Sequence, residues 1–108
     1  MGFNIIVYKK MPNNKMQSQD DLWNSNKYVG ELEIFKSLIE EPVQMIPSKE
    51  DYNAMLHGDN IYYRPLNFEL AAKRFLHTLK DVNCNEQIFI KLFLALYDNP
   101  DIYILGSY

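Results

Sequence analysis

Apolar positions along the chain follow two periodicities, one of about two residues and one of about 3.6 residues. Segment 3–8 is an almost continuous apolar and β-branched run, which predicts a central strand. Segment 9–21 is polar and contains Pro12 and an Asn pair, so it predicts a long surface loop. Segments 60–64 and 102–105 are short and rich in isoleucine and tyrosine, and they predict two further strands.

The remaining apolar residues recur at helical intervals. Residues 28–41 predict a helix, and a strand over 29–35 is the alternative because charged and apolar residues also alternate there. A short helix is expected over 48–58, where a Ser and an Asp three residues later resemble a capping box. Asn67 and Asn83 each precede a longer amphipathic stretch and predict capped helices. The second of these helices is apolar on much of its circumference, which predicts a central helix.

These elements predict one α/β (α+β) domain over residues 1–108, in the order β-α-α-β-α-α-β. Its sheet would have about three short strands, packed with about four helices, and residues 42–47 would be a linker. The length suits a single domain, and 47% apolar and 23% charged residues are ordinary for a globular protein. The periodic apolar positions predict this core: Ile5, Val7, Phe35, Leu38, Phe75, Leu79, Phe89, Leu92, Leu96 and Ile104.

Charge and cysteine content narrow the class of protein. The net charge of −3 comes from 11 basic and 14 acidic residues without a clustered basic face, which argues against nucleic acid as a partner. Cys84 is the single cysteine, so a disulfide within the chain is ruled out. The apolar run at 3–7 is too short for a signal peptide or a membrane span. We therefore expect a cytoplasmic protein that neither binds nor enters a membrane.

Residues able to perform chemistry are few. His57, His77 and Cys84 do not have the spacing of a metal site, and we expect no metal and no cofactor. Cys84 lies at a predicted helix start, which would lower its pKa, and His77 lies seven residues earlier. A small cysteine-dependent enzyme that uses these two residues is therefore an alternative. Because the sequence shows no third group to orient them, we expect a non-enzymatic protein.

Binding is the function that the remaining pattern favours. Aromatic residues make up 14% of the chain, and Tyr, Trp and Arg are the types enriched at binding hot spots. Strand alternation sends Tyr62 and Tyr63 to opposite faces, so one of them is expected to reach solvent. Acidic residues beside them would speed the encounter with a basic partner. The predicted partner-binding residues are Asp20, Asp21, Trp23, Asp59, Tyr62 and Arg64.

Two fragments carry a resemblance to known proteins. Residues 1–8 (MGFNIIVY) and residues 62–65 (YYRP) resemble segments of small, uncharacterised bacterial and phage proteins. By size and style, the chain is similar to immunity proteins of bacterial toxin–immunity pairs. That resemblance implies an inhibitor, monomeric or homodimeric, that covers the functional surface of a toxin, and the toxin domain could be basic. A phage or structural protein that self-associates through an edge strand at 102–105 is a further alternative.

Overall fold

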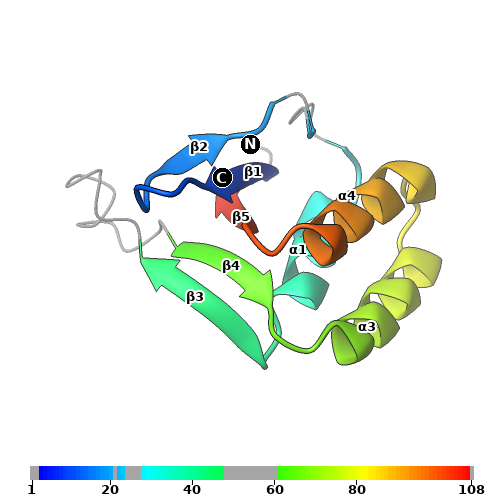
Figure 1. The fold of residues 1–108 in the computed structure, drawn as a ribbon. Helices are drawn as coiled ribbons and strands as arrows, with labels where there is room; N and C mark the ends of the chain where they lie inside the picture. The colour runs from blue at the N-terminus through cyan, green and yellow to red at the C-terminus, as the bar shows by residue number, and fades with distance from the viewer. Residues whose placement is uncertain (1–2, 21, 24–27, 48–60, 108) are drawn as a thin grey trace.

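The computed structural model describes residues 3–20, 22–23, 28–47 and 61–107. Within these residues, five strands form one antiparallel sheet and three helices pack on it (Figure 1). The elements, in chain order, are β1 (Asn4–Lys10), β2 (Met16–Ser18), α1 (Glu31–Leu38), β3 (Val43–Pro47), β4 (Ile61–Pro65), α3 (Phe68–Asp81), α4 (Glu86–Asp98) and β5 (Ile102–Ser107). The strand order across the sheet is β2-β1-β5-β4-β3.

The fold class is therefore a mixed α+β domain, but the predicted numbers of elements need correction. Strand β2 lies in the predicted loop 9–21, and β3 lies in the predicted linker 42–47. The segment 28–41 is helical at Glu31–Leu38, as predicted, and not a strand. The short helix predicted over 48–58 falls outside the described residues. Among the described residues, no helix has both the length and the hydropathy needed to cross a membrane.

The two faces of the sheet bury two separate clusters. On the face that the helices cover, Ile5 and Val7 of β1 and Ile102 and Ile104 of β5 pack among helix residues. All ten residues of the predicted core belong to this cluster. The opposite face carries a smaller cluster of three buried residues, Tyr62, Tyr103 and Leu105. Partly buried side chains from three further strands surround it: Ile6 and Tyr8 of β1, Met16 of β2 and Ile46 of β3.

Strand β5 occupies the middle of the sheet and pairs with β1 on one side and β4 on the other. The hypothesis of self-association through an edge strand at 102–105 is therefore wrong, because both edges of β5 are already hydrogen-bonded to neighbours. Four consecutive residues of β5 are buried, so side chains on both faces of this strand are covered. Burial on both faces is typical of a central strand.

Candidate interaction surface

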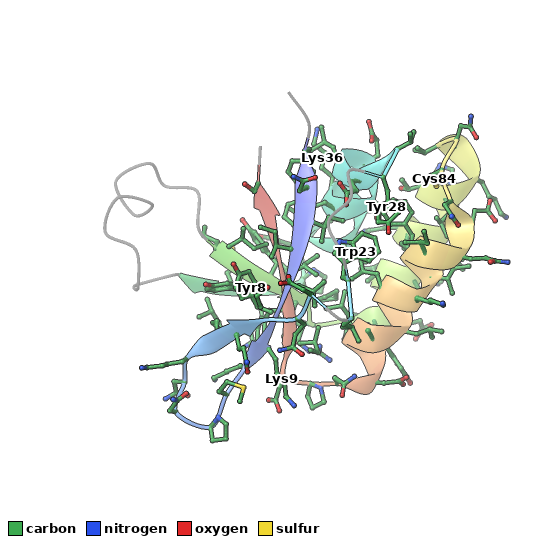
Figure 2. All side chains as sticks on the ribbon, turned by 90° about the horizontal axis from the view of Figure 1, so that it is seen from above. Tyr8, Lys9, Trp23, Tyr28, Lys36 and Cys84 are labelled. Atoms are coloured by element: carbon green, nitrogen blue, oxygen red, sulfur yellow. The ribbon has the colours of Figure 1, made fainter. Side chains whose placement is uncertain are left out.

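Trp23, predicted to be an exposed anchor, belongs to the core. Its indole N–H donates to the carbonyl of Ile5 at 3.0 Å, and its ring packs against Phe89 and Tyr28. Strand β2 is too short to pair with this end of β1, so the indole satisfies an edge carbonyl that would otherwise lack a donor. Figure 2 shows Trp23 on the helix side of β1 and Tyr8 on the other side. Trp23 therefore closes an edge of the sheet.

Tyr62 and Arg64 are also buried, for different reasons. Tyr62 lies in the cluster on the opposite sheet face, with its ring edge-on to Tyr8 at 4.9 Å. The Arg64 guanidinium donates to the carbonyls of Asn99 and Ile102 at 2.7 and 3.0 Å. These contacts tie β4 to the turn that leads into β5. Both side chains have structural partners inside the domain.

The six predicted contact residues do not form one surface in the part of the chain that the structure describes. Trp23 and Tyr62 lie on opposite faces of the sheet, and Asp21 and Asp59 fall outside the described residues. Asp20 is exposed, accepts a hydrogen bond from the Ser18 hydroxyl at 2.8 Å and lines a hollow of about 390 Å³. Alternation does separate Tyr62 from its neighbour Tyr63, but neither is fully exposed because both faces of the sheet are covered.

The cysteine and histidine proposed for the alternative enzyme also have other roles. Burial and the nearby Glu86 carboxylate raise the pKa of the Cys84 thiol, whereas a nucleophilic cysteine needs a lowered pKa. Cys84 lies just before the cap of α4, and there it does not receive the expected activation. The His77 ring is exposed and lies 3.2 Å from the Asp81 carboxylate on the same helix. Within the described residues, no group of three His, Cys, Asp or Glu side chains is arranged to hold a metal ion.

A groove of about 560 Å³ separates α1 from α3. The Arg74 guanidinium lies 3.2 Å from the Glu40 carboxylate on one side of it, and it also donates to the Glu40 and Glu41 carbonyls. The His77–Asp81 pair lies in the same groove. Arg74 joins α3 to the segment that follows α1, and His77 pairs with Asp81 within α3. The groove is therefore better explained as a junction between packed elements than as a ligand site.

A buried carboxyl group lies at the start of α1. Glu31 is 2% exposed, and neither of its carboxylate oxygens makes a hydrogen bond of good length and angle. Burial raises the pKa of this carboxyl from 4.5 to about 7, although the backbone of Ile5 acts in the opposite direction. Gly30 begins the helix with a φ of 87°, a conformation that glycine adopts without strain. The start of α1 therefore keeps an acid inside the core.

The clearest unsatisfied surface lies on α4. The inner side of this helix buries Phe89, Leu92 and Leu96, and the Asn85 side chain caps its start by accepting from a backbone N–H at 3.4 Å. On the outer side, three large apolar side chains remain exposed, and we call them the outer-helix stripe: Ile90 (38%), Leu94 (50%) and Tyr97 (60%). Their spacing of four and three residues places them along one face of the helix.

One end of the stripe contacts the neighbouring helix. The Tyr97 ring lies edge-on to Phe68 at the start of α3, with 5.5 Å between ring centroids. Phe93 stacks on Phe75 of α3 at 4.9 Å, so ring contacts join the two helices on the flank of the stripe. Figure 1 shows α3 and α4 side by side. A preorganised apolar side chain loses little conformational entropy when a partner covers it.

The sequence contained a signal for this surface, although that signal led to the prediction that α4 is a central helix. Residues 88–97 are apolar on almost every side, and a helix of that kind needs cover nearly all round. In the structure, α4 contacts the sheet and α3 on its inner side and flank, and the outer-helix stripe faces outwards.

Comparison of the chain with protein-family models, with curated proteins and with solved structures finds no match.

Proposed function

We propose that this chain is a non-enzymatic protein-binding domain and that the outer-helix stripe is its contact surface. The observation that carries this proposal is the exposure of Ile90, Leu94 and Tyr97 side by side on a capped, well-packed helix. Single exposed apolar residues are normal, but a contiguous group on a rigid element is typical of a surface that another protein covers.

The chemistry of the other candidate residues supports binding over catalysis. The raised pKa of the Cys84 thiol disfavours the thiolate that a nucleophilic reaction would use. His77 is highly exposed and engaged by Asp81 on its own helix. A catalytic acid–base pair works best in a site that excludes water, and the His77 ring lies in an open groove.

A narrower form of the proposal is an immunity-type inhibitor that covers the functional surface of a toxin. Among the predicted contacts that the structure describes, Asp20 is the exposed one. Trp23, Tyr62 and Arg64 would contribute only indirectly, because they hold the sheet together from inside. In this form, the stripe supplies the apolar centre of the interface. Asp20 is close enough to Tyr8, on the opposite face of the sheet, to help raise the pKa of that tyrosine, so it would act on the encounter with a basic toxin and not in the rim around the stripe.

Site-specific photo-crosslinking in cells of the source organism tests the proposed surface. A photoreactive phenylalanine analogue would replace Leu94 in one variant and Met45 in a control variant. Met45 is exposed to a similar extent, 54%, but lies on the edge strand β3. We expect a covalent protein adduct at position 94 and none at position 45. No adduct at position 94, or equal adducts at both positions, would contradict the proposal. A toxin domain in the adduct would support the inhibitor.

A further inference from the structure

Two charged residues flank the outer-helix stripe on the same side. Lys91 and Asp98 are seven residues apart, or about two helical turns, so both project along one flank of α4. Both are exposed, and neither has an ion-pair partner among the described residues. The distance of two turns prevents them from pairing with each other. The flank therefore presents one positive and one negative group, each open to a partner.

Asp98 is in an unfavourable position for an isolated helix. It is the last residue of α4, and the last turn contains no basic residue. Because the C-terminal end of a helix carries partial negative charge, an acid there destabilises the helix. Asp98 itself has no ion-pair partner among the described residues, although the Arg64 guanidinium donates to the Asn99 carbonyl at this end of the helix, at 2.7 Å. A cation supplied by another molecule would pair directly with the Asp98 carboxylate.

We propose that the outer-helix stripe binds a second copy of this chain, with the two α4 helices antiparallel across a twofold axis near Leu94. This inference rests on the proposed function and names the partner at that surface. In such a pair, the residue n positions after Leu94 in one copy faces the residue about n positions before Leu94 in the other copy. Tyr97 then meets Ile90 of the second copy, and Asp98 meets Lys91.

The pairing is self-complementary in charge. In antiparallel helices, like flanks face each other, so the flank that carries Lys91 and Asp98 meets the same flank of the second copy. The twofold axis generates each contact twice, which gives two Asp98–Lys91 pairs around a centre of Leu94 side chains. The flank carries one charge of each sign, so its net charge favours neither a basic nor an acidic foreign protein. The alternation of charge favours an antiparallel copy of itself.

The area of the surface sets the expected strength. A large apolar side chain presents about 200 Å² when fully exposed. With 38%, 50% and 60% exposed, the stripe offers about 300 Å² from each copy. With its charged flank and the neighbouring part of α3, the pair would bury about 1,000 Å² in total, at the low end of specific interfaces. We therefore expect a reversible dimer that dissociates in the micromolar range.

Analytical ultracentrifugation of the purified chain, from about 1 µM to about 1 mM, tests this pairing. We expect a concentration-dependent shift from monomer to dimer. Leu94→Arg should weaken dimerisation by at least about tenfold, because it places two cations on the axis. The matched control, Met45→Arg, should behave as the wild type. Circular dichroism of each variant confirms that it is folded. A wild type that stays monomeric up to 1 mM, about the weakest affinity expected of a specific interface, would overturn the proposal.

A charge-exchange experiment tests the antiparallel register itself. Lys91→Glu places two carboxylates together at each contact, and Asp98→Lys places two ammonium groups together. Each variant alone should dimerise at least about tenfold more weakly than the wild type. An equimolar mixture should regain dimerisation, because one copy of the mixed dimer carries acids at positions 91 and 98 and the other carries lysines at both. Every contact then joins opposite charges. A mixture that associates no better than either variant would refute this register.

Failure of this inference can be told apart from failure of the proposed function. If the purified chain is monomeric at every concentration but position 94 crosslinks to a different protein in cells, the second copy is the wrong partner and the binding surface stands. If position 94 forms no adduct and the chain is monomeric, both proposals fail. An adduct of twice 12.8 kDa, together with recovery in the mixture, supports both.

Discussion

Replacing Glu31 by glutamine should stabilise the protein at neutral and alkaline pH but not at acidic pH. The carboxyl is 2% exposed, and the nearby Ile5 backbone, which lowers its pKa, offsets only part of the effect of burial. In the folded state its pKa is raised from 4.5 to about 7, because burial penalises the charged form. Glutamine has nearly the same shape and carries no charge at any pH. The substitution therefore removes the cost of ionisation and leaves the packing in place.

The direction of the effect follows from proton binding. Between pH 4.5 and about 7, the folded state holds a proton on Glu31 that the unfolded chain has already lost. The contribution of this group is therefore fully present below pH 4.5 and is lost as pH rises through the folded pKa. The folded and unfolded pKa values differ by about 2.5, and a difference of one is worth about 1.4 kcal/mol, so roughly 3 kcal/mol separates the two extremes.

Equilibrium unfolding in urea, measured at several values from about pH 4 to pH 8, provides the assay. Trp23 is the single tryptophan of the chain and is buried against Phe89, so its fluorescence reports the loss of the core. The free energies of unfolding of wild type and Glu31→Gln should nearly coincide at pH 4 and differ by roughly 3 kcal/mol at pH 8. Glu33→Gln, a change on the same helix outside the core, serves as the control and should follow the wild type. A constant difference between wild type and Glu31→Gln across this range would refute the reasoning.

Three further changes test other parts of the structure. Gly30→Ala should destabilise the fold by about 2 kcal/mol or more in urea unfolding. The added Cβ would lie 2.6 Å from the Val82 side chain, and the φ of residue 30 is 87°, which alanine adopts only with strain. Unchanged stability would contradict this geometry. Arg64→Met should cost about 3 kcal/mol in the same assay, because the buried Ile102 carbonyl and the part-buried Asn99 carbonyl lose their donor. Arg74→Met at the surface should cost about 1 kcal/mol or less, and equal costs would refute the structural role of Arg64. Cys84 should react with a thiol reagent at pH 8 more slowly than free cysteine, because burial and a nearby carboxylate raise its pKa, and a faster reaction would revive the enzyme hypothesis.

The core could be predicted from the sequence because burial follows periodicity. Phe75 and Leu79 on α3, and Phe89 and Leu96 on α4, recur at helical intervals, and a helix with one apolar side must place that side inside. The start of α3 at an Asn cap was predicted for the same local reason, because a side-chain oxygen beside the first free N–H groups satisfies them within one turn. For α4 the cap is Asn85, two residues after the predicted Asn83, because either Asn could serve and packing chose between them.

Strands β2 and β3 were missed because their conformation depends on pairing with a neighbouring strand, which their own residues do not signal. Strand β2 has three mostly polar residues and exists because it pairs with the end of β1. Strand β3 pairs with β4, which follows it in the chain after a long interval. Short segments without alternation carry little strand signal of their own, and the backbone hydrogen bonds offered by a neighbouring strand decide their conformation.

The candidate surface was placed wrongly for a related reason. Trp23, Tyr62 and Arg64 are residue types common both at interfaces and at the edges of cores. Their polar tips are satisfied by backbone carbonyls or covered by rings that are far away in sequence, such as the carbonyl of Ile5 for Trp23. The sequence showed that α4 is apolar on most of its circumference, but it did not show which side of the helix other elements leave uncovered.

Residue order by itself determined the class of fold, the inward faces of the long helices and the membership of the main core, because each depends on spacing within a few turns or a single strand. Only the tertiary structure decided which edges of the sheet are free, which aromatic and charged side chains are enclosed, and that Ile90, Leu94 and Tyr97 face outwards. Those outcomes depend on what lies opposite each side chain, and long-range packing sets that neighbour.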